Sequence, residues 1–275
     1  MAQSTTLEIH PRQRWLNLRQ NDGAARPQPT RPLDCPRPQS IRGGEGALDW
    51  QKFDPGWARK PAATAARELI IMRLLGPIVE HYTHPVTLGK EVLDGIKPPV
   101  IFAANHSSHL DTPTILRSFP KEWRSRIATI AAADYFYKNR VVASLVTLSF
   151  ATVPIERKGG LSKLTTDRLA LLLKEGWSLL VYPEGTRTRD GKLARMRSGA
   201  AFIAVENAIP VVPVNVMGTY RSMPVGRPWP AKHPVVIHLG NALYPAPGED
   251  HKALTSRLQA ALERMRRDSS PFTGN

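Results

Sequence analysis

The distribution of apolar residues from Pro85 onward predicts a chain that alternates between strands and helices. Short apolar runs rich in β-branched residues favour strands, and they are separated by segments in which apolar residues recur at helical spacing. This alternation is typical of an α/β fold, in which helices flank a central sheet. We therefore predict a single α/β domain with a mostly parallel or mixed sheet. The predicted strands include Val100–Ala104, Ile127–Ala132, Trp177–Tyr182, Ile209–Val216 and Val235–Leu239.

Two segments have clear helical periodicity. Leu161–Glu175 places its leucines close to helical spacing, and Gly176 follows where a helix stop is expected. Glu249–Asp268 has one apolar face, which predicts an amphipathic helix. Proline restricts one of the strands, because it lacks the N–H that a sheet ladder uses. We therefore expect Pro210 and Pro213 to lie at the start or the edge of their strand.

Two further apolar segments bear on membrane contact. Neither reaches the roughly twenty nearly uncharged residues that a transmembrane helix needs. Leu69–Val79 contains Arg73 and follows several cations, so it is either an interfacial helix at a lipid surface or a helix packed on the domain. Val141–Ile155 is uncharged and short, and we expect it to be buried core. The predicted organisation is a disordered tail, a helical and possibly interfacial segment, and the main domain, at residues 1–50, 51–84 and 85–275.

The composition of residues 1–50 differs from that of the rest. Prolines punctuate a segment with few apolar residues and scattered arginines, a composition typical of disorder. The single cysteine of the chain, Cys35, lies in this segment. No intramolecular disulfide can form, and we expect a reducing, cytoplasmic environment.

The formal net charge of the chain is +15. A field of this sign concentrates anionic partners near the protein, and nucleic acid, anionic lipid and phosphorylated small molecules all fit. The net charge does not distinguish among these three kinds of partner, so the distinction depends on the sequence motifs.

The first candidate site is the run Asn-His-Ser-Ser-His-Leu-Asp at 105–111. It follows a predicted strand and precedes a helix that Pro113 helps to open, and such loops hold reactive side chains on α/β scaffolds. An acidic side chain at the helix entrance can turn back to meet an imidazole in the loop, so Asp111 is placed to orient His106. An oriented imidazole can act as a general base near neutral pH.

The second candidate site is Pro183-Glu184-Gly185-Thr186-Arg187, which also follows a predicted buried strand. Glycine lets the backbone approach a ligand, and an arginine is suited to bind a phosphate. The sequence therefore predicts a phosphate-binding site at the end of a second strand.

Together these motifs resemble those of the glycerolipid acyltransferase family, which includes the 1-acylglycerol-3-phosphate acyltransferases. The family's Asn-His-x-Ser-x-x-Asp motif is present from Asn105 to Asp111, and its Pro-Glu-Gly-Thr-Arg motif is intact from Pro183 to Arg187. Two lesser blocks, Val153–Arg157 and Ile209–Val214, are similar to blocks of the family and follow in order. The resemblance covers about residues 85–220. The chain departs from it at Tyr182, where the family often has Phe, and at Arg197, where the family has a lysine-rich step.

The resemblance implies an acyltransferase that moves a fatty acyl group from acyl-CoA or acyl carrier protein to a lysophosphatidate or related glycerol-phosphate acceptor in phospholipid synthesis. It implies that His106 is the base and Asp111 orients it, with no cofactor and no metal. The implied substrate-binding residues are Arg157, Glu184, Gly185, Thr186 and Arg187. Its implied location is the cytoplasm, peripherally at an anionic membrane surface on the inner face, and we expect no nucleic-acid partner.

Two alternatives belong to other classes of protein. His106, His109 and Asp111 are all competent zinc ligands, so a metal-dependent hydrolase is possible, although that leaves the second motif without a role. A basic nucleic-acid-binding protein would use the net charge and a few aromatic residues, but no recognisable module supports it.

Overall fold

The computed structural model describes residues 53, 55–156 and 162–273 of the chain. These ranges contain both candidate motifs, at 105–111 and 183–187. The tail expected at residues 1–50 and the predicted binding residue Arg157 lie outside the described residues.

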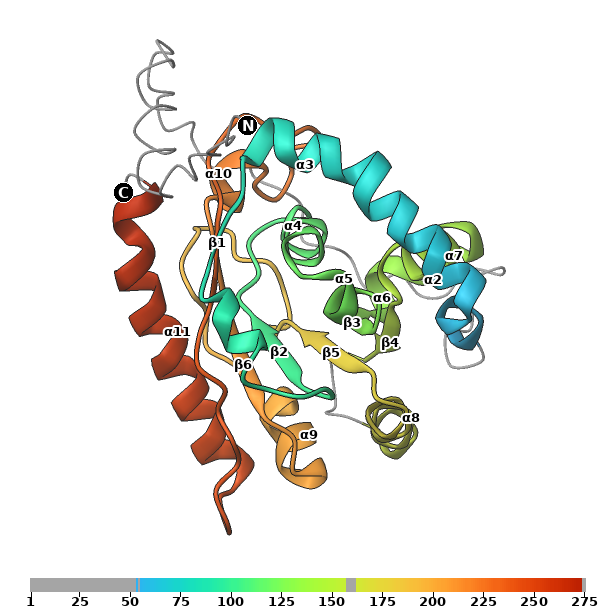
Figure 1. Ribbon diagram of the computed structural model, residues 1–275, viewed down its shortest axis with the longest axis vertical. Coiled ribbons are helices and arrows are strands. Elements are labelled where there is room, and N and C mark those ends of the chain that lie inside the picture. Colours follow the sequence, from blue (N-terminus) through green and yellow to red (C-terminus); the bar gives the residue numbers. More distant parts are fainter. Residues whose placement is uncertain (1–52, 54, 157–161, 274–275) are drawn as a thin grey trace, which may run out of the picture.

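One sheet of seven strands organises the described part of the chain, in the order β1-β7-β6-β2-β5-β3-β4 (Figure 1). Neighbouring strands from β6 to β4 are parallel, whereas β7 is antiparallel to β6 and β1 is parallel to β7. The predicted fold class, an α/β domain with a mostly parallel, mixed sheet, is confirmed. The strands are β1 (Val86–Leu88), β2 (Ile101–Ala104), β3 (Ile127–Ala132), β4 (Val153–Ile155), β5 (Ser178–Val181), β6 (Val211–Met217) and β7 (Val236–Leu239).

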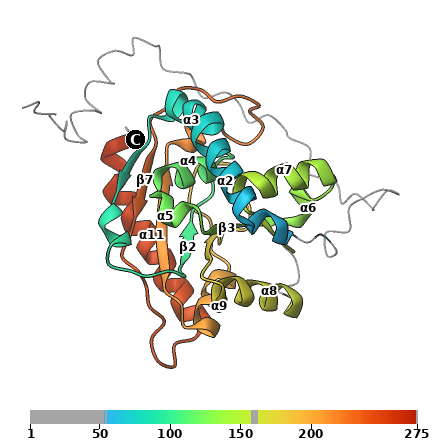
Figure 2. The ribbon, with the colours of Figure 1, turned by 45° about the vertical axis from the view of Figure 1, so that its right-hand side comes forward.

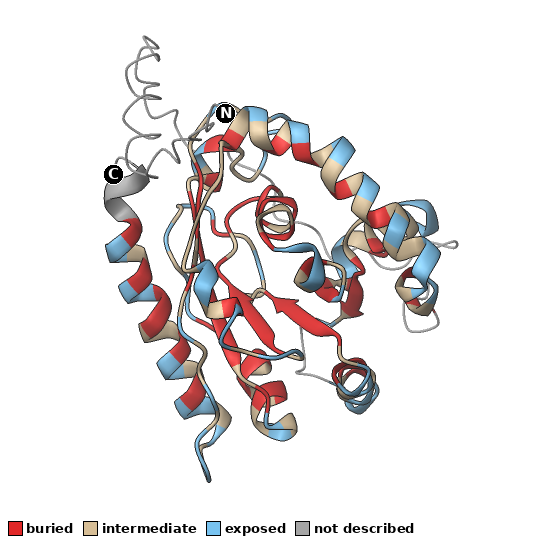
Figure 3. Cartoon of the chain, viewed as in Figure 1, coloured by how far each residue is buried: buried red, intermediate tan, exposed pale blue. Residues whose placement is uncertain are grey.

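Helices cover both faces of the sheet, and the strands between them are almost entirely buried (Figures 1 and 3). Apolar side chains from α8, α9 and α11 pack on one face, and those from α4 and η2 pack on the other. The central strands are therefore apolar on both faces, as parallel strands between helix layers generally are. The covering helices are α4 (Asp111–Ser118), α8 (Lys163–Lys174), α9 (Gly199–Asn207), α11 (His251–Thr273) and the π-helical η2 (Ile70–Leu75).

Local sequence signals set the ends of the main helices. The Ser162 side chain accepts the Thr165 N–H at the start of α8, and Gly176, at φ +79°, follows its end. The shorter helices are η1 (Pro55–Arg59), η3 (Lys90–Leu93), α5 (Lys121–Arg124), α6 (Ala133–Phe136) and α10 (Thr219–Ser222).

The first helical segment runs without a break through α2 (Pro61–Leu69), η2 and α3 (Gly76–Thr83), as Figure 1 shows. Its buried Arg67 donates to the backbone oxygens of Ala58 and Leu148, which ties it to η1 and to α7 (Arg140–Phe150). This segment packs on the domain, although Leu69 and Leu74 remain exposed. No helix in the described residues is both long and apolar enough to cross a membrane.

The prediction that Val141–Ile155 is buried core is wrong for residues 141–150. These residues belong to α7, which lies with α6 near the β4 edge of the sheet, beside α2 (Figures 1 and 2). Only Ala143 and Thr147 of α7 are fully buried, whereas Val141 and Leu145 are exposed. An uncharged sequence does not distinguish a helix inside the core from a helix with an exposed apolar side.

The prediction that Pro213 lies at the start or the edge of its strand is also wrong, because Pro213 is inside β6, a central strand paired with β2 and β7. The geometry explains the exception. The Pro213 carbonyl accepts the Gly240 N–H, so its nitrogen faces the β7 side of the strand. Gly240 comes one residue after the end of β7, so the missing N–H removes no bond from the β6–β7 ladder.

Candidate active site

The predicted site residues gather where the parallel strands end. His106 follows β2 and Asp111 begins α4, while the second motif follows β5, which is directly paired with β2. In open α/β sheets, ligands bind at the carboxyl ends of the strands. Two motifs that are remote in the sequence therefore lie beside each other.

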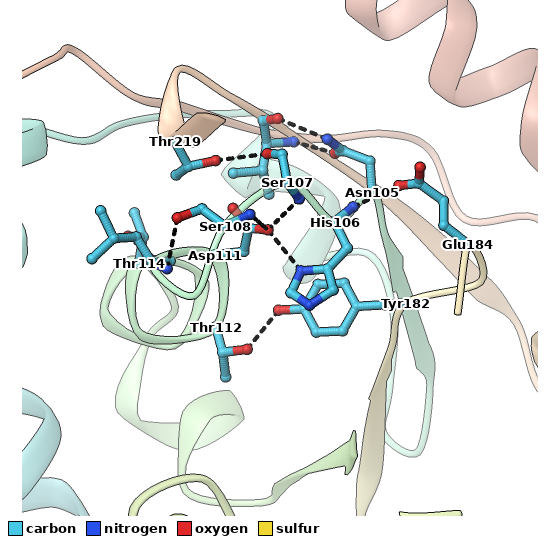
Figure 4. A network of polar contacts seen from close by, with 12 residues as sticks. Asn105, His106, Ser107, Ser108, Asp111, Thr112, Thr114, Tyr182, Glu184 and Thr219 are labelled. Atoms are coloured by element: carbon cyan, nitrogen blue, oxygen red, sulfur yellow. Dashed lines mark hydrogen bonds and ion pairs between the residues drawn. The ribbon is translucent and has the colours of Figure 1, made fainter. Parts of the chain in front are cut away.

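The His106 imidazole is held by the fully buried Asp111 side chain (Figure 4). The distance from His106 Nδ1 to Asp111 Oδ2 is 2.8 Å. The same oxygen accepts the backbone N–H groups of Ser107 at 2.7 Å and of Ser108 at 2.9 Å. Because Asp111 Oδ2 accepts two backbone N–H groups, it also acts as an acceptor toward the imidazole. His106 therefore carries its proton on Nδ1, and its Nε2 has a free lone pair.

The loop that carries His106 is fastened at both ends. Asn105 bonds the backbone of Val216 in both directions, with Val216 N–H donated to Asn105 Oδ1 at 2.6 Å and Asn105 Nδ2 donated to the Val216 oxygen at 2.9 Å. The Ser107 hydroxyl lies 3.0 Å from that of Thr219. These bonds join the end of β2 to the end of β6 and preorganise the imidazole.

Tyr182 provides a flat wall for the imidazole. Its ring stacks on that of His106 at a centroid distance of 4.0 Å and an interplanar angle of 21° (Figure 4). The Tyr182 hydroxyl lies 2.7 Å from the Thr112 hydroxyl. Burial, with a smaller contribution from the charge of Asp111, raises the pKa of Tyr182 well above its ordinary value, so this phenol stays neutral.

Glu184 joins the two motifs. One carboxylate oxygen accepts the His106 N–H at 2.6 Å and the other accepts the Ala194 N–H at 2.8 Å. Burial raises the pKa of this carboxyl, and the two backbone N–H groups partly oppose that shift. Glu184 is buried and its contacts are with backbone, so it positions the loops around the site.

Arg187 lies beside Tyr135. Its guanidinium carbon is 5.6 Å from the centre of the Tyr135 ring, and its Nη2 is 3.4 Å from the Tyr135 hydroxyl. Gly185, at φ +73°, allows the turn between β5 and Arg187, since a side chain there would be strained and would crowd Arg197.

A cavity of about 1220 Å³, here called the main cavity, opens beside the imidazole. His106, Gly185, Thr186 and Arg187 line it, and Glu184 and Asp111 do not. Its lining is mostly apolar, with walls from α6, α7, α8, α9 and the ends of β3 and β5. Representative apolar lining residues are Ile130, Phe136, Val146, Phe150, Leu169 and Ile203.

The main cavity is located where two strands part. β3 pairs with β5 only as far as Thr129, opposite Leu180, and its next residue, Ile130, pairs instead with Val153 of β4 on the other side. The ends of β3 and β5 therefore have no ladder between them, and both line the main cavity.

His109 contacts Tyr135 and Phe136. Its Nε2 lies 3.0 Å from the Tyr135 hydroxyl. Burial first, and then repulsion from Arg187, lowers the pKa of His109 to about 4, so it is neutral at physiological pH. No group of three or more His, Cys, Asp or Glu side chains in the described residues is arranged to hold a metal ion, so the geometry gives no support to the zinc alternative.

Sequence reasoning misses several residues around the site. The sequence marks Tyr182 only as a departure from a family pattern, and it does not identify Tyr135 and Arg189 as lining residues of the main cavity. The only signal for Tyr135 is the aromatic run at 135–137, which is equally typical of a core.

Comparison with known proteins agrees with this geometry. Residues 86–217 match the family model described as Acyltransferase. This segment, a little less than half of the chain, is similar to the acyltransferase family. The segment contains both motifs, so the resemblance predicted from the sequence is confirmed.

Several acyltransferases are similar to this chain. A chloroplastic 1-acyl-sn-glycerol-3-phosphate acyltransferase of Brassica napus is 30% identical over 159 residues, which cover 54% of this chain and 43% of the relative. Another, of Arabidopsis thaliana, is 31% identical over 157 residues, covering 54% and 41%. The chain thus matches less than half the length of these relatives.

The fold is similar to the crystal structure of a 1-acyl-sn-glycerophosphate acyltransferase, PlsC, from Thermotoga maritima. The TM-score is 0.59 at 23% identity, over 78% of this chain and 83% of that one. At this identity the likeness concerns the fold.

Proposed function

We propose that the protein transfers a fatty acyl group from a thioester carrier to the hydroxyl of a lysophosphatidate-type acceptor. One observation carries the proposal: the imidazole of the His106–Asp111 pair lies on the wall of a large apolar cavity that Arg187 also lines. A base, a cation and apolar space in one cavity match an acceptor with a hydroxyl, a phosphate and a hydrocarbon chain.

The chemistry assigned to His106 follows from its tautomer. With Nδ1–H donated to Asp111, Nε2 takes the proton of the acceptor hydroxyl while that oxygen attacks the thioester carbonyl. The C–S bond then breaks, and the imidazolium returns the proton to the departing thiolate. The net reaction converts a thioester and an alcohol into an ester and a thiol, and no acyl-enzyme is needed.

Substrate binding is assigned to the second motif. Arg187 offers the acceptor phosphate a planar set of donors, and Thr186, which is exposed at the rim, adds a hydroxyl. Gly185 leaves room for the phosphate beside the backbone. Glu184 contributes by holding the loops in place, and Arg157 is assigned to the acceptor from its motif position alone. The main cavity exceeds the usual range of about 300–1,000 Å³ for small-ligand sites, and its apolar depth suits an acyl chain.

The acyl donor is assigned from the thioester that the reaction needs, and the cellular location is assigned from the net charge. Acyl-CoA and acyl carrier protein both present a thioester, and either fits the reaction. The net charge of +15 favours work at an anionic surface, and we place the protein at the cytoplasmic face of a membrane, bound peripherally.

The test uses the purified full-length chain with long-chain acyl-CoA and acyl carrier protein, with and without lysophosphatidate. We expect free thiol to be released only when acceptor is present, and a diacyl product by mass detection. His106→Ala should abolish release, and His81→Ala, at an exposed position on α3, should not. Equal thiol release without acceptor would identify a thioesterase and reject the proposal.

Arg187→Ala separates binding from chemistry. We expect the phosphate contact to be the same in ground and transition states, so this change should raise KM for lysophosphatidate more than it lowers kcat. A fall in kcat with unchanged KM would contradict the assignment of Arg187 to the phosphate.

A further inference from the structure

Helix α7 presents an apolar surface to solvent. Val141, Val142 and Leu145 are 66%, 46% and 59% exposed. They form one side of the helix, whereas Ala143 and Thr147 hold the opposite side in the domain. We call these three exposed residues the α7 patch.

The same helix forms a wall of the main cavity. Val146 and Phe150 line the cavity, and Val146 follows Val142 of the α7 patch by one turn. Residues four apart on an α-helix differ by only about 40° around its axis. Apolar surface therefore continues around α7 from the outside of the molecule to the interior of the cavity.

Cations flank the α7 patch. Lys138 and Arg140 are exposed at the start of α7, and Arg187 and Arg189 line the main cavity. The sequence contains no Asp or Glu between residues 135 and 155, and the acids on either side of this range are Asp134 and Glu156. An exposed apolar helix face with cations at its end has the chemistry of a segment that lies in an anionic lipid interface.

Other exposed leucines lack this setting. Leu164 and Leu171 of α8 are 50% and 56% exposed, but Asp167 lies between them and neither lines the main cavity. Leu69 and Leu74 on the first helical segment also have a cation nearby, Arg73, but neither lines the main cavity.

We propose that α7 docks the protein on an anionic bilayer, with the α7 patch entering the lipid, and that acyl chains pass along α7 between the bilayer and the main cavity. The second half of this inference rests on the proposed function, and the first half does not. The partner is a lipid surface, because cations flank the α7 patch and the patch is continuous with the apolar lining of the main cavity.

The first test measures flotation of the full-length chain with vesicles made of equal parts phosphatidylcholine and phosphatidylglycerol. The double variant Val141→Asp/Leu145→Asp should bind at least about tenfold more weakly, since two inserted apolar side chains are replaced by like-charged ones. The matched pair Leu164→Asp/Leu171→Asp adds the same charge on α8 and should bind as the unchanged chain does. Equal loss in both pairs, or loss confined to Leu69→Asp/Leu74→Asp, overturns the inference.

A second test locates the inserted residue directly. Cys35 is the only cysteine of the chain, so Cys35→Ser with Leu145→Cys allows a single environment-sensitive fluorophore to be attached to α7. Its emission should shift to the blue on adding these vesicles, and the same label at Leu171→Cys should not shift. A shift at position 171 without one at position 145 rejects docking through α7.

The outcome for transfer is separable from the outcome for docking. With acceptor and donor in neutral detergent micelles, Val141→Asp/Leu145→Asp should release thiol at the rate of the unchanged chain, and only transfer on vesicles should fall. Failure of the unchanged chain to transfer in either medium refutes the proposed function and leaves the flotation result standing. Full transfer by this variant on vesicles refutes the passage of acyl chains along α7.

Discussion

Asp111 is the residue whose replacement best tests the reasoning about the site, because its two carboxylate oxygens have different surroundings. Oδ2 accepts three hydrogen bonds, from His106 and from the backbone of Ser107 and Ser108. Oδ1 is buried and has no hydrogen-bond partner among the described residues. Asparagine and alanine at this position should therefore have different consequences.

The magnitudes follow from these contacts. In Asp111→Asn, the amide oxygen can replace Oδ2 and keep all three bonds, but its NH₂ group is then buried without an acceptor, at a cost of about 1–3 kcal/mol. In Asp111→Ala, the two backbone N–H groups lose their acceptor, which costs about 2–6 kcal/mol in all. Both variants lose the negative charge that stabilises the imidazolium, so kcat should fall by about 10²- to 10⁴-fold in each.

The assay combines thiol release at saturating acceptor with thermal unfolding of each variant. Since about 1 kcal/mol lowers Tm by roughly 2–4 °C in domains of this size, the alanine variant should unfold several degrees below the asparagine variant. Asp111→Asn with unchanged kcat would refute the orienting role of the carboxylate. An alanine variant as stable as the asparagine variant would refute the hydrogen-bond argument.

Three further changes test separate features. Tyr182→Phe keeps the stacked ring and removes only the bond to Thr112, so stability should fall by about 0.5–1.5 kcal/mol with little change in kcat, whereas Tyr182→Leu should lower kcat. The pKa of His109 falls from 6.5 to about 4 on folding, so between these pH values the unfolded chain binds a proton that the folded protein does not. The free energy of unfolding should therefore decline as pH falls from 6.5 toward 4, and urea titration should show a shallower decline in His109→Asn. Gly218→Ala, whose Cβ would lie 2.1 Å from a backbone oxygen, should lower Tm more than Gly248→Ala, which also has a positive φ but open space.

Much of the fold could be predicted because its elements have strong local periodicity. The apolar faces of α8 and α11 are legible in the sequence, and Leu169, Leu254 and Leu258 are buried as that periodicity requires. Their flanking signals are local too, as Gly176 illustrates. The pairing of His106 with Asp111 was equally accessible, since they are five positions apart and a strand end and a helix start fix their geometry.

What escaped prediction depends on which elements become neighbours. The sequence places two motifs after two strands, but β3 and β4 intervene, and nothing local states that β5 lies directly against β2. Pro213 is a related case. Its residue type argues for a strand edge. Proline is nevertheless tolerated in this central strand, because β7 ends one residue before the position opposite Pro213, where a backbone N–H would otherwise be needed for the ladder.

The main cavity depends on the same kind of non-local choice. β3 exchanges its partner between Thr129 and Ile130, from β5 to β4, and each half of the strand has an ordinary apolar pattern. The exchange leaves the Thr129 hydroxyl buried without a partner among the described residues, beside apolar walls that α7 completes. In an ordinary protein core, larger side chains would fill such a gap, because atoms that line an empty space lose their packing contacts. The gap is instead lined by small and apolar residues on one side and, on the other, by α7, which has no charged residue after Arg140 and has an exposed apolar face. That combination explains why 141–155 resembles core in the sequence: its composition fits a hydrocarbon environment, and the sequence alone does not say whether protein or lipid supplies it.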